Sequence, residues 1–301
     1  MWPHLLPALI KGDVKAVARC ISLVENEAEG YEDFLAQLPQ NNIKIIGITG
    51  PPGAGKSTVV NALVREAVAD NKQVAVLCVD PSSPFNLGAV LGDRIRMNEW
   101  YTHPAVFIRS LATRGSVGGL TSKIIEITSV LKAAPFDVVI VETVGVGQSE
   151  IEIAGLADVT VVVLVPEGGD EVQTMKAGLM EIADVFVVNK SDRPGADVFV
   201  KNLRLMLAPA FSNRQKEVQI IKTTAATGEG ITELYEVLKK LLLEETSSEK
   251  HTWLLAEKAY QLIQQKRMHG IDRAALAVQI KTEKNFNLYR FVQRFEQNKY
   301  A

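Results

Sequence analysis

The chain has 301 residues, and its 33 Lys and Arg against 35 Asp and Glu give a formal charge of −2. Proteins that bind nucleic acid through general electrostatics are usually basic, so this balance speaks against that class. With only Cys20 and Cys78, the chain is not a disulfide scaffold, and a reduced, cytoplasmic compartment is expected. The longest apolar runs are strand-sized, and the first residues lack the basic start of a signal peptide, so we expect neither membrane insertion nor export.

Seven short runs rich in Val and Ile predict β-strands. They are residues 43–49, 74–80, 106–110, 137–143, 159–165, 185–189 and 218–223. Most are continuously apolar rather than alternating, as is typical of parallel strands buried on both faces. Between them, helical spacing of apolar residues predicts helices at 57–69, 120–131, 172–182 and 231–243. The alternation predicts an α/β fold with a doubly wound, mostly parallel sheet and ligands at the carboxyl ends of its strands.

The two ends of the chain differ from this central part. Residues 1–40 predict an N-terminal helical extension, with two short helices around 26–30 and no strand. Residues 41–245 form the predicted sheet domain. Residues 246–301 open with a polar break and predict a helical arm, with apolar helical spacing at 253–263 and 286–295. Periodicity leaves open whether the terminal helices cap the sheet or form an oligomer interface.

The pattern G-x-x-x-x-G-K-[ST] occurs directly after the first predicted strand, where it predicts a phosphate-binding P-loop. Glycines let the backbone turn its N–H groups toward phosphate oxygens, and the following helix adds its positive N-terminus. Lys56 can reach the β- and γ-phosphates, and the Ser57 hydroxyl can ligate Mg²⁺. The expected nucleotide contacts are Gly50, Pro51, Pro52, Gly53, Ala54, Gly55, Lys56, Ser57 and Thr58.

A second motif, Asn189-Lys190-Ser191-Asp192, follows the sixth predicted strand and fits the N-K-x-D guanine-recognition element. A carboxylate at Asp192 can accept from both N1–H and the exocyclic amine of guanine. Adenine does not offer this pair of donors, so Asp192 would select GTP and GDP. Asn189 would tie the loop together, while the Lys190 stem can cover the base.

Acidic residues at strand ends are candidate magnesium ligands. Glu142 ends the fourth predicted strand, where a carboxylate can approach Mg²⁺ or a water, and the Gly145 N–H can contact the γ-phosphate. Asp80 ends the second strand and Asp93 lies downstream, so both are candidates for the Mg²⁺ shell. The alternatives are a solvated carboxylate at Glu142 and a helix cap or turn at Asp80 and Asp93.

Together these motifs resemble the MeaB/ArgK family of P-loop GTPases, which are chaperones of adenosylcobalamin-dependent acyl-CoA mutases. The resemblance rests on residues 50–58, 79–83, 91–94, 141–150 and 189–192. It implies phosphate, metal and hydrolysis roles for Lys56, Ser57, Asp80, Asp93 and Glu142, and a switch-loop role for Lys176, whose alternative is a solvated helix lysine. It also implies guanine contacts at Thr224 and Ala225, where Thr replaces the usual Ser.

The resemblance therefore implies a Mg²⁺-dependent GTP-hydrolysing switch that assists such a mutase and works as a homodimer. Two other functions stay open: an ATP-dependent kinase accessory to amino-acid transport, and a nucleotide-bound scaffold without significant turnover. The four histidines are scattered without metal-ligand spacing. Four arginines after the second and third strands, Arg94, Arg96, Arg109 and Arg114, could serve phosphates or form salt bridges.

Overall fold

The computed structural model describes residues 2–80, 97–112, 120–143, 149–166, 180, 182–211, 218–244, 249–267, 272–283 and 285–300. They fall into two compact units, Met1–Leu254 and Leu255–Ala301. The first unit contains the sheet and the nucleotide-binding motifs, and the second is helical.

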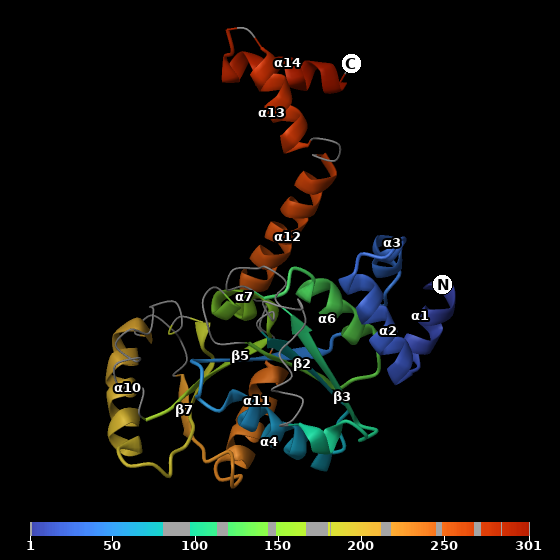
Figure 1. Ribbon diagram of the computed structural model, residues 1–301. Helices are drawn as coiled ribbons and strands as arrows, with labels where there is room; N and C mark the ends of the chain where they lie inside the picture. The colour runs from blue at the N-terminus through green and yellow to red at the C-terminus, as the bar shows by residue number, and fades with distance from the viewer. Residues whose placement is uncertain are drawn as a thin grey trace. The chain divides into compact units, whose positions relative to one another are not determined.

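Seven parallel strands form one sheet in the order β3-β2-β4-β1-β5-β6-β7 (Figure 1). The strands are β1 Lys44–Thr49, β2 Val74–Asp80, β3 Val106–Ala112, β4 Val138–Glu142, β5 Val159–Leu164, β6 Val185–Val188 and β7 Gln219–Lys222. All seven predicted strands are present, and the predicted doubly wound parallel sheet is confirmed. Because all strands run in one direction, the loops after β1, β4, β6 and β7 leave the same edge of the sheet.

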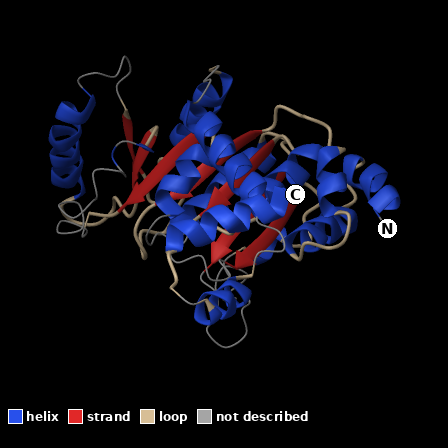
Figure 2. Ribbon diagram, turned by 90° about the horizontal axis from the view of Figure 1, so that it is seen from above, coloured by secondary structure: helices blue, strands red, loops and turns tan. Residues whose placement is uncertain are grey.

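Helices cover both faces of the sheet, as Figure 2 shows. On one face, α4 (Lys56–Ala69) and α11 (Ile231–Leu243) bury their apolar sides against β1, β5 and β6. On the other face lie α2 (Val14–Glu25), α6 (Ile124–Ala133), α7 (Ser149–Leu156) and α10 (Ala196–Phe211). Three predicted helices thus correspond to α4, α6 and α11, whereas the predicted helix at 172–182 lies mostly outside the described residues.

The N-terminal segment forms three helices, so the prediction of two was wrong. They are α1 (Trp2–Ile10), α2 and α3 (Tyr31–Ala36). The extra break falls where Asp13 caps α2 by accepting from the Ala16 N–H at 2.7 Å, which starts a new helix. These helices bury apolar residues in the same core as α6, so they belong to the first unit.

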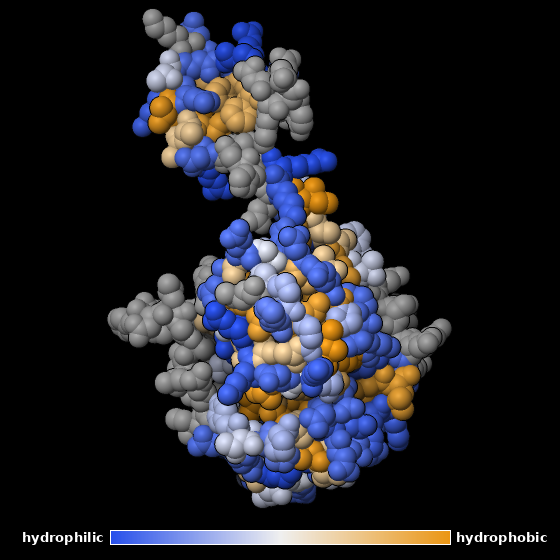
Figure 3. Space-filling model, turned by 90° about the vertical axis from the view of Figure 1, so that its right-hand side faces the viewer, coloured by the Kyte–Doolittle hydropathy of each residue, from blue (hydrophilic) through white to orange (hydrophobic). Residues whose placement is uncertain are grey.

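The C-terminal part of the chain forms α12 (Glu249–Arg267), α13 (Arg273–Thr282) and α14 (Leu288–Tyr300). The spacing predicts α12 and α14 but not α13, whose small apolar residues run consecutively. No residue of α13 is buried, and apolar side chains gather on the surface of this second unit (Figure 3). Among the described residues, no helix has the length and apolar character needed to cross a membrane.

Candidate functional site

The P-loop connects the end of β1 to the start of α4, as predicted. Lys56 is the first residue of α4 and is buried, with its Nζ donating to the carbonyl oxygens of Gly50 at 2.9 Å and Pro51 at 3.1 Å. Its ammonium therefore lies inside the loop formed by residues 50–55, beside the positive N-terminus of α4. An anion entering the loop would meet this charge and the helix dipole together.

Ser57 and Glu142 lie together because Ser57 is in the first turn of α4, which follows β1 through the P-loop, and Glu142 ends the strand beside β1. β4 pairs with β1, and Glu142 at its end accepts a hydrogen bond from Ser57 at 2.7 Å between Oγ and Oε1. Both side chains are buried. A hydroxyl and a carboxylate are oxygen ligands of the kind that Mg²⁺ prefers, so this pair fits a hard divalent cation.

The other expected metal and switch residues are not placed by the structure. The side chain of Asp80 and all of Asp93, Gly145 and Lys176 lie outside the described residues. Within the described part of the chain, no group of three or more His, Cys, Asp or Glu side chains could hold a metal ion. A complete magnesium site would thus need ligands beyond the Ser57–Glu142 pair.

Asn189 joins three loops at the centre of the expected base site. Its Nδ2 donates to the Ala54 carbonyl of the P-loop at 2.9 Å. Its Oδ1 accepts from the Thr223 hydroxyl and from the Ala225 N–H, both at 3.1 Å. The Asn189 side chain is buried, so these bonds hold the P-loop, the N-K-x-D loop and the loop after β7 in a fixed arrangement.

Lys190 and Ser191 add two further links between the same loops. Lys190 has a left-handed backbone (φ 56°), and its Nζ donates to the Gly53 carbonyl at 2.8 Å. The Ser191 hydroxyl lies 3.2 Å from the Thr224 hydroxyl, and the backbone N–H of Ser191 donates to the Thr223 carbonyl at 3.0 Å. The N-K-x-D pattern assigns no role to Ser191. The signal for it in the sequence is that both Ser191 and the unusual Thr224 carry hydroxyl groups.

Asp192 is exposed and lines a cavity of about 810 Å³ that continues along α10 and β7. This volume lies in the range of small-molecule sites. Further along the cavity, Asp197 pairs with Lys222 at 2.9 Å, and this hydrogen bond and charge lower the pKa of Asp197 below its usual value. Asp192 therefore faces open space, while Asp197 forms an ion pair with Lys222 across the cavity.

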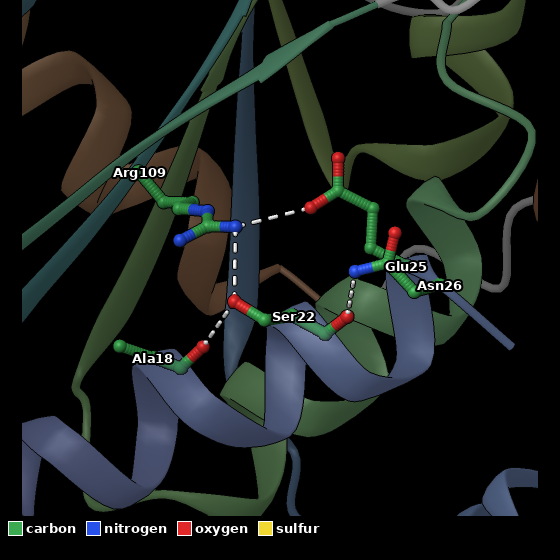
Figure 4. A network of polar contacts seen from close by, with 5 residues as sticks. All are labelled: Ala18, Ser22, Glu25, Asn26 and Arg109. Carbon is green, nitrogen blue, oxygen red and sulfur yellow. Dashed lines mark hydrogen bonds and ion pairs between the residues drawn. The ribbon is translucent and has the colours of Figure 1, made fainter. Parts of the chain in front are cut away.

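Arg109 serves the fold rather than the phosphate site. It lies within β3, and its guanidinium donates to Glu25 at 3.0 Å and to the Ser22 hydroxyl at 3.2 Å (Figure 4). Both partners belong to α2, so the ion pair ties the N-terminal helices to the sheet. For Arg109 the salt-bridge interpretation is the one that agrees with the structure, and Arg94, Arg96 and Arg114 lie outside the described residues.

A parallel sheet with a P-loop after its central strand and an N-K-x-D loop hydrogen-bonded to that P-loop defines the class of P-loop nucleotide-binding proteins. Comparison with known proteins gives the family. The model of the family described as methylmalonyl Co-A mutase-associated GTPase MeaB matches residues 17–276. The chain belongs to this family, and it is a GTPase.

Individual relatives agree with this assignment. A protein of Pyrococcus horikoshii named as a GTPase is 49% identical over 250 residues, which cover 81% of this chain and 79% of the relative. The mouse methylmalonic aciduria type A homolog, mitochondrial, is 34% identical over 260 residues, covering 79% of this chain and 62% of the relative. The solved structure of an LAO/AO transport system kinase superposes with a TM-score of 0.66 at 25% identity, covering 98% of this chain and 97% of that one.

Proposed function

We propose that this GTPase is a Mg²⁺-dependent guanine-nucleotide switch that assists an adenosylcobalamin-dependent acyl-CoA mutase, methylmalonyl-CoA mutase or a relative, in loading or protecting its cofactor. The family description, which names that mutase, and the name of the mouse relative support the choice of partner. The observation that carries guanine-nucleotide binding is the bonding of Asn189 and Lys190 to the P-loop carbonyls of Ala54 and Gly53. Base recognition and phosphate binding are thereby joined in one rigid arrangement.

The proposed roles follow from the positions of the side chains. Lys56 would turn from its two carbonyl partners to the β- and γ-phosphates, whose charge it offsets during in-line attack by water. Ser57, Glu142, Asp80 and Asp93 would hold Mg²⁺, which when bound neutralises charge on the phosphates. Glu142 or Asp93 would also help to order the attacking water.

Asp192 is the proposed determinant of base choice, and Asp192→Asn tests it. An amide offers one acceptor and one donor, which match the N1–H and the C2 carbonyl of xanthine rather than the two donors of guanine. We expect GDP affinity to fall about 100-fold or more and XDP to bind in its place. Asp197→Asn, in the same cavity, is the control and should leave base preference unchanged.

Titration of the wild-type protein with GDP and ADP in parallel tests the alternative of an ATP-dependent kinase, which the name of the matched structure raises. Tighter binding of ADP, or an Asp192→Asn variant that still prefers GDP, would overturn the proposed base choice.

The proposed partner is tested by co-purification with a cobalamin-dependent mutase, with and without a non-hydrolysable GTP analogue. We expect nucleotide-dependent association and faster phosphate release in the presence of the mutase. Lys176→Ala should remove this stimulation and leave basal hydrolysis unchanged. If phosphate release is negligible with and without the mutase, the protein is a nucleotide-bound scaffold instead.

The second unit supports a homodimer. It exposes large apolar side chains along all three of its helices, among them Tyr260, Ile263, Val278 and Tyr289. A unit of 47 residues is too small to form a core that would bury them, so a second copy of the chain could cover them instead. We expect Val278→Asp in the full chain to shift the mass measured by light scattering from dimer to monomer. Val198→Asp on α10 is a matched control, since both valines are 62% exposed. A monomeric wild type would contradict the proposal.

A further inference from the structure

Thr49 and Thr143 form a buried hydroxyl pair beside the nucleotide site. Thr49 ends β1 just before the P-loop, and Thr143 directly follows Glu142 at the end of β4. Their Oγ1 atoms are 2.9 Å apart, and the two residues are 0% and 1% exposed. The Thr143 N–H also donates to the Ile48 carbonyl at 3.0 Å, which extends the β1–β4 ladder by one residue.

The surroundings of this pair would accept valine. β4 is Val and Ile up to Glu142, and β1 has Ile at three of its six positions, so most side chains that precede the pair on these strands are apolar. Apolar contact is not directional, so two valines would pack there without fixing the exact offset between the strands. A hydroxyl pair is satisfied only at one distance and orientation, so it fixes the relative position of the two strand ends.

The pair lies on the opposite face of the sheet from the Ser57–Glu142 contact. Side chains alternate between faces along a strand, and Glu142 faces α4, where it meets Ser57. Thr143 therefore faces the other side, and the end of β4 is held from both faces, by Ser57 on one and by Thr49 on the other.

We propose that Thr49 and Thr143 are positioning residues for GTP hydrolysis, which hold Glu142 in place relative to the P-loop throughout the nucleotide cycle. The proposal rests on the proposed role of Ser57 and Glu142 in holding Mg²⁺. Mg²⁺ would take the Ser57 oxygen as a ligand, so the Ser57–Glu142 contact would change when the site fills. The two threonine hydroxyls bond to each other rather than to Ser57 or Glu142, so we expect the pair to keep its geometry in both states.

Three variants test this role. Thr143→Val leaves the Thr49 hydroxyl buried without its partner and should lower both stability and hydrolysis. Thr49→Val with Thr143→Val removes both hydroxyls, so stability should largely return. Thr143→Ser keeps the hydroxyl and should behave as wild type. Thr128→Val is the matched control, because the Thr128 hydroxyl is equally buried but bonds only to the backbone of its own helix.

The decisive measurement is the coupling between Mg²⁺ and nucleotide, taken as the ratio of the GDP dissociation constants without and with Mg²⁺, together with kcat for GTP. A displacement of Glu142 by a fraction of an ångström should lower kcat by about tenfold and reduce the Mg²⁺ coupling by a similar factor. We expect this loss in Thr143→Val and also in the double variant, although urea unfolding should show that the double variant has regained most of the wild-type stability.

A double variant with wild-type kcat and Mg²⁺ coupling would overturn the proposal, because the pair would then serve stability alone. A loss in Thr128→Val of the same size would also overturn it. If wild-type nucleotide binding and hydrolysis do not depend on Mg²⁺, the proposed metal site itself fails and this role fails with it. A Mg²⁺-dependent wild type with an unaffected double variant refutes only the positioning role.

Discussion

Gly55 is the position where one added methyl group should break the hydrogen bond between the P-loop and the N-K-x-D loop. It precedes α4 with a left-handed backbone (φ 86°), and a Cβ built there lies 2.4 Å from the Asn189 Nδ2 atom. Gly53 in the same loop also has a left-handed backbone (φ 78°), but a Cβ there meets nothing within 4 Å. Gly55→Ala and Gly53→Ala therefore share the backbone strain and differ in the collision with Asn189.

The expected loss in the free energy of unfolding has two parts, the backbone strain and the collision with Asn189. The left-handed conformation costs a residue with a Cβ about 1–2 kcal/mol, and both variants carry this term. In Gly55→Ala the Asn189 amide must also leave the Ala54 carbonyl, and a buried polar group left without its bond costs about 1–3 kcal/mol. We expect Gly55→Ala to be less stable than Gly53→Ala by about 2 kcal/mol, or about 4–8 °C in Tm for a unit of this size.

Thermal and urea unfolding of the nucleotide-free protein measure this difference. A double-mutant cycle with Asn189→Ala isolates the collision, since Gly55→Ala should cost only the strain once the amide is gone. Equal losses in Gly53→Ala and Gly55→Ala would refute the reasoning. So would a Gly55→Ala penalty that is the same with and without the Asn189 side chain.

Two further predictions concern the N-terminal helices. Burial raises the pKa of Cys20 to about 11, so in a Cys78→Ser background its alkylation at pH 8 should be about 100-fold slower than in the unfolded chain. Because the folded state holds this proton more tightly, stability should fall as the pH rises from about 9 toward 11; fast alkylation of the folded protein at pH 8 would contradict both points. Arg109→Met should cost about 1–3 kcal/mol in urea unfolding, since it removes the guanidinium from a largely buried Glu25 carboxylate. Adding Glu25→Gln should recover part of that loss, and purely additive losses would argue against the ion pair.

Local sequence patterns were enough to predict the strands, most of the helices and the loops that carry the chemistry. Runs of Val and Ile mark all seven strands because parallel strands are buried on both faces and need apolar residues throughout. The P-loop could be placed between β1 and α4 because its glycines, lysine and serine act within eight consecutive residues. The boundary between one helix and the next was harder to predict, since the break between α1 and α2 depends on a single cap at Asp13.

The residues that meet across the site are far apart in the sequence, and no local pattern predicts their contacts. Ser57 bonds to Glu142 across 85 residues, Thr49 to Thr143 across 94, and Asn189 to Ala54 across 135. These contacts depend on the strand order, which inserts β4 between β2 and β1 and places β5 on the other side of β1. A local pattern predicts that a strand exists and which loop comes after it. Which strands become neighbours is set by packing of the whole sheet and its helices, and this packing placed Glu142 against Ser57 and Thr143 against Thr49.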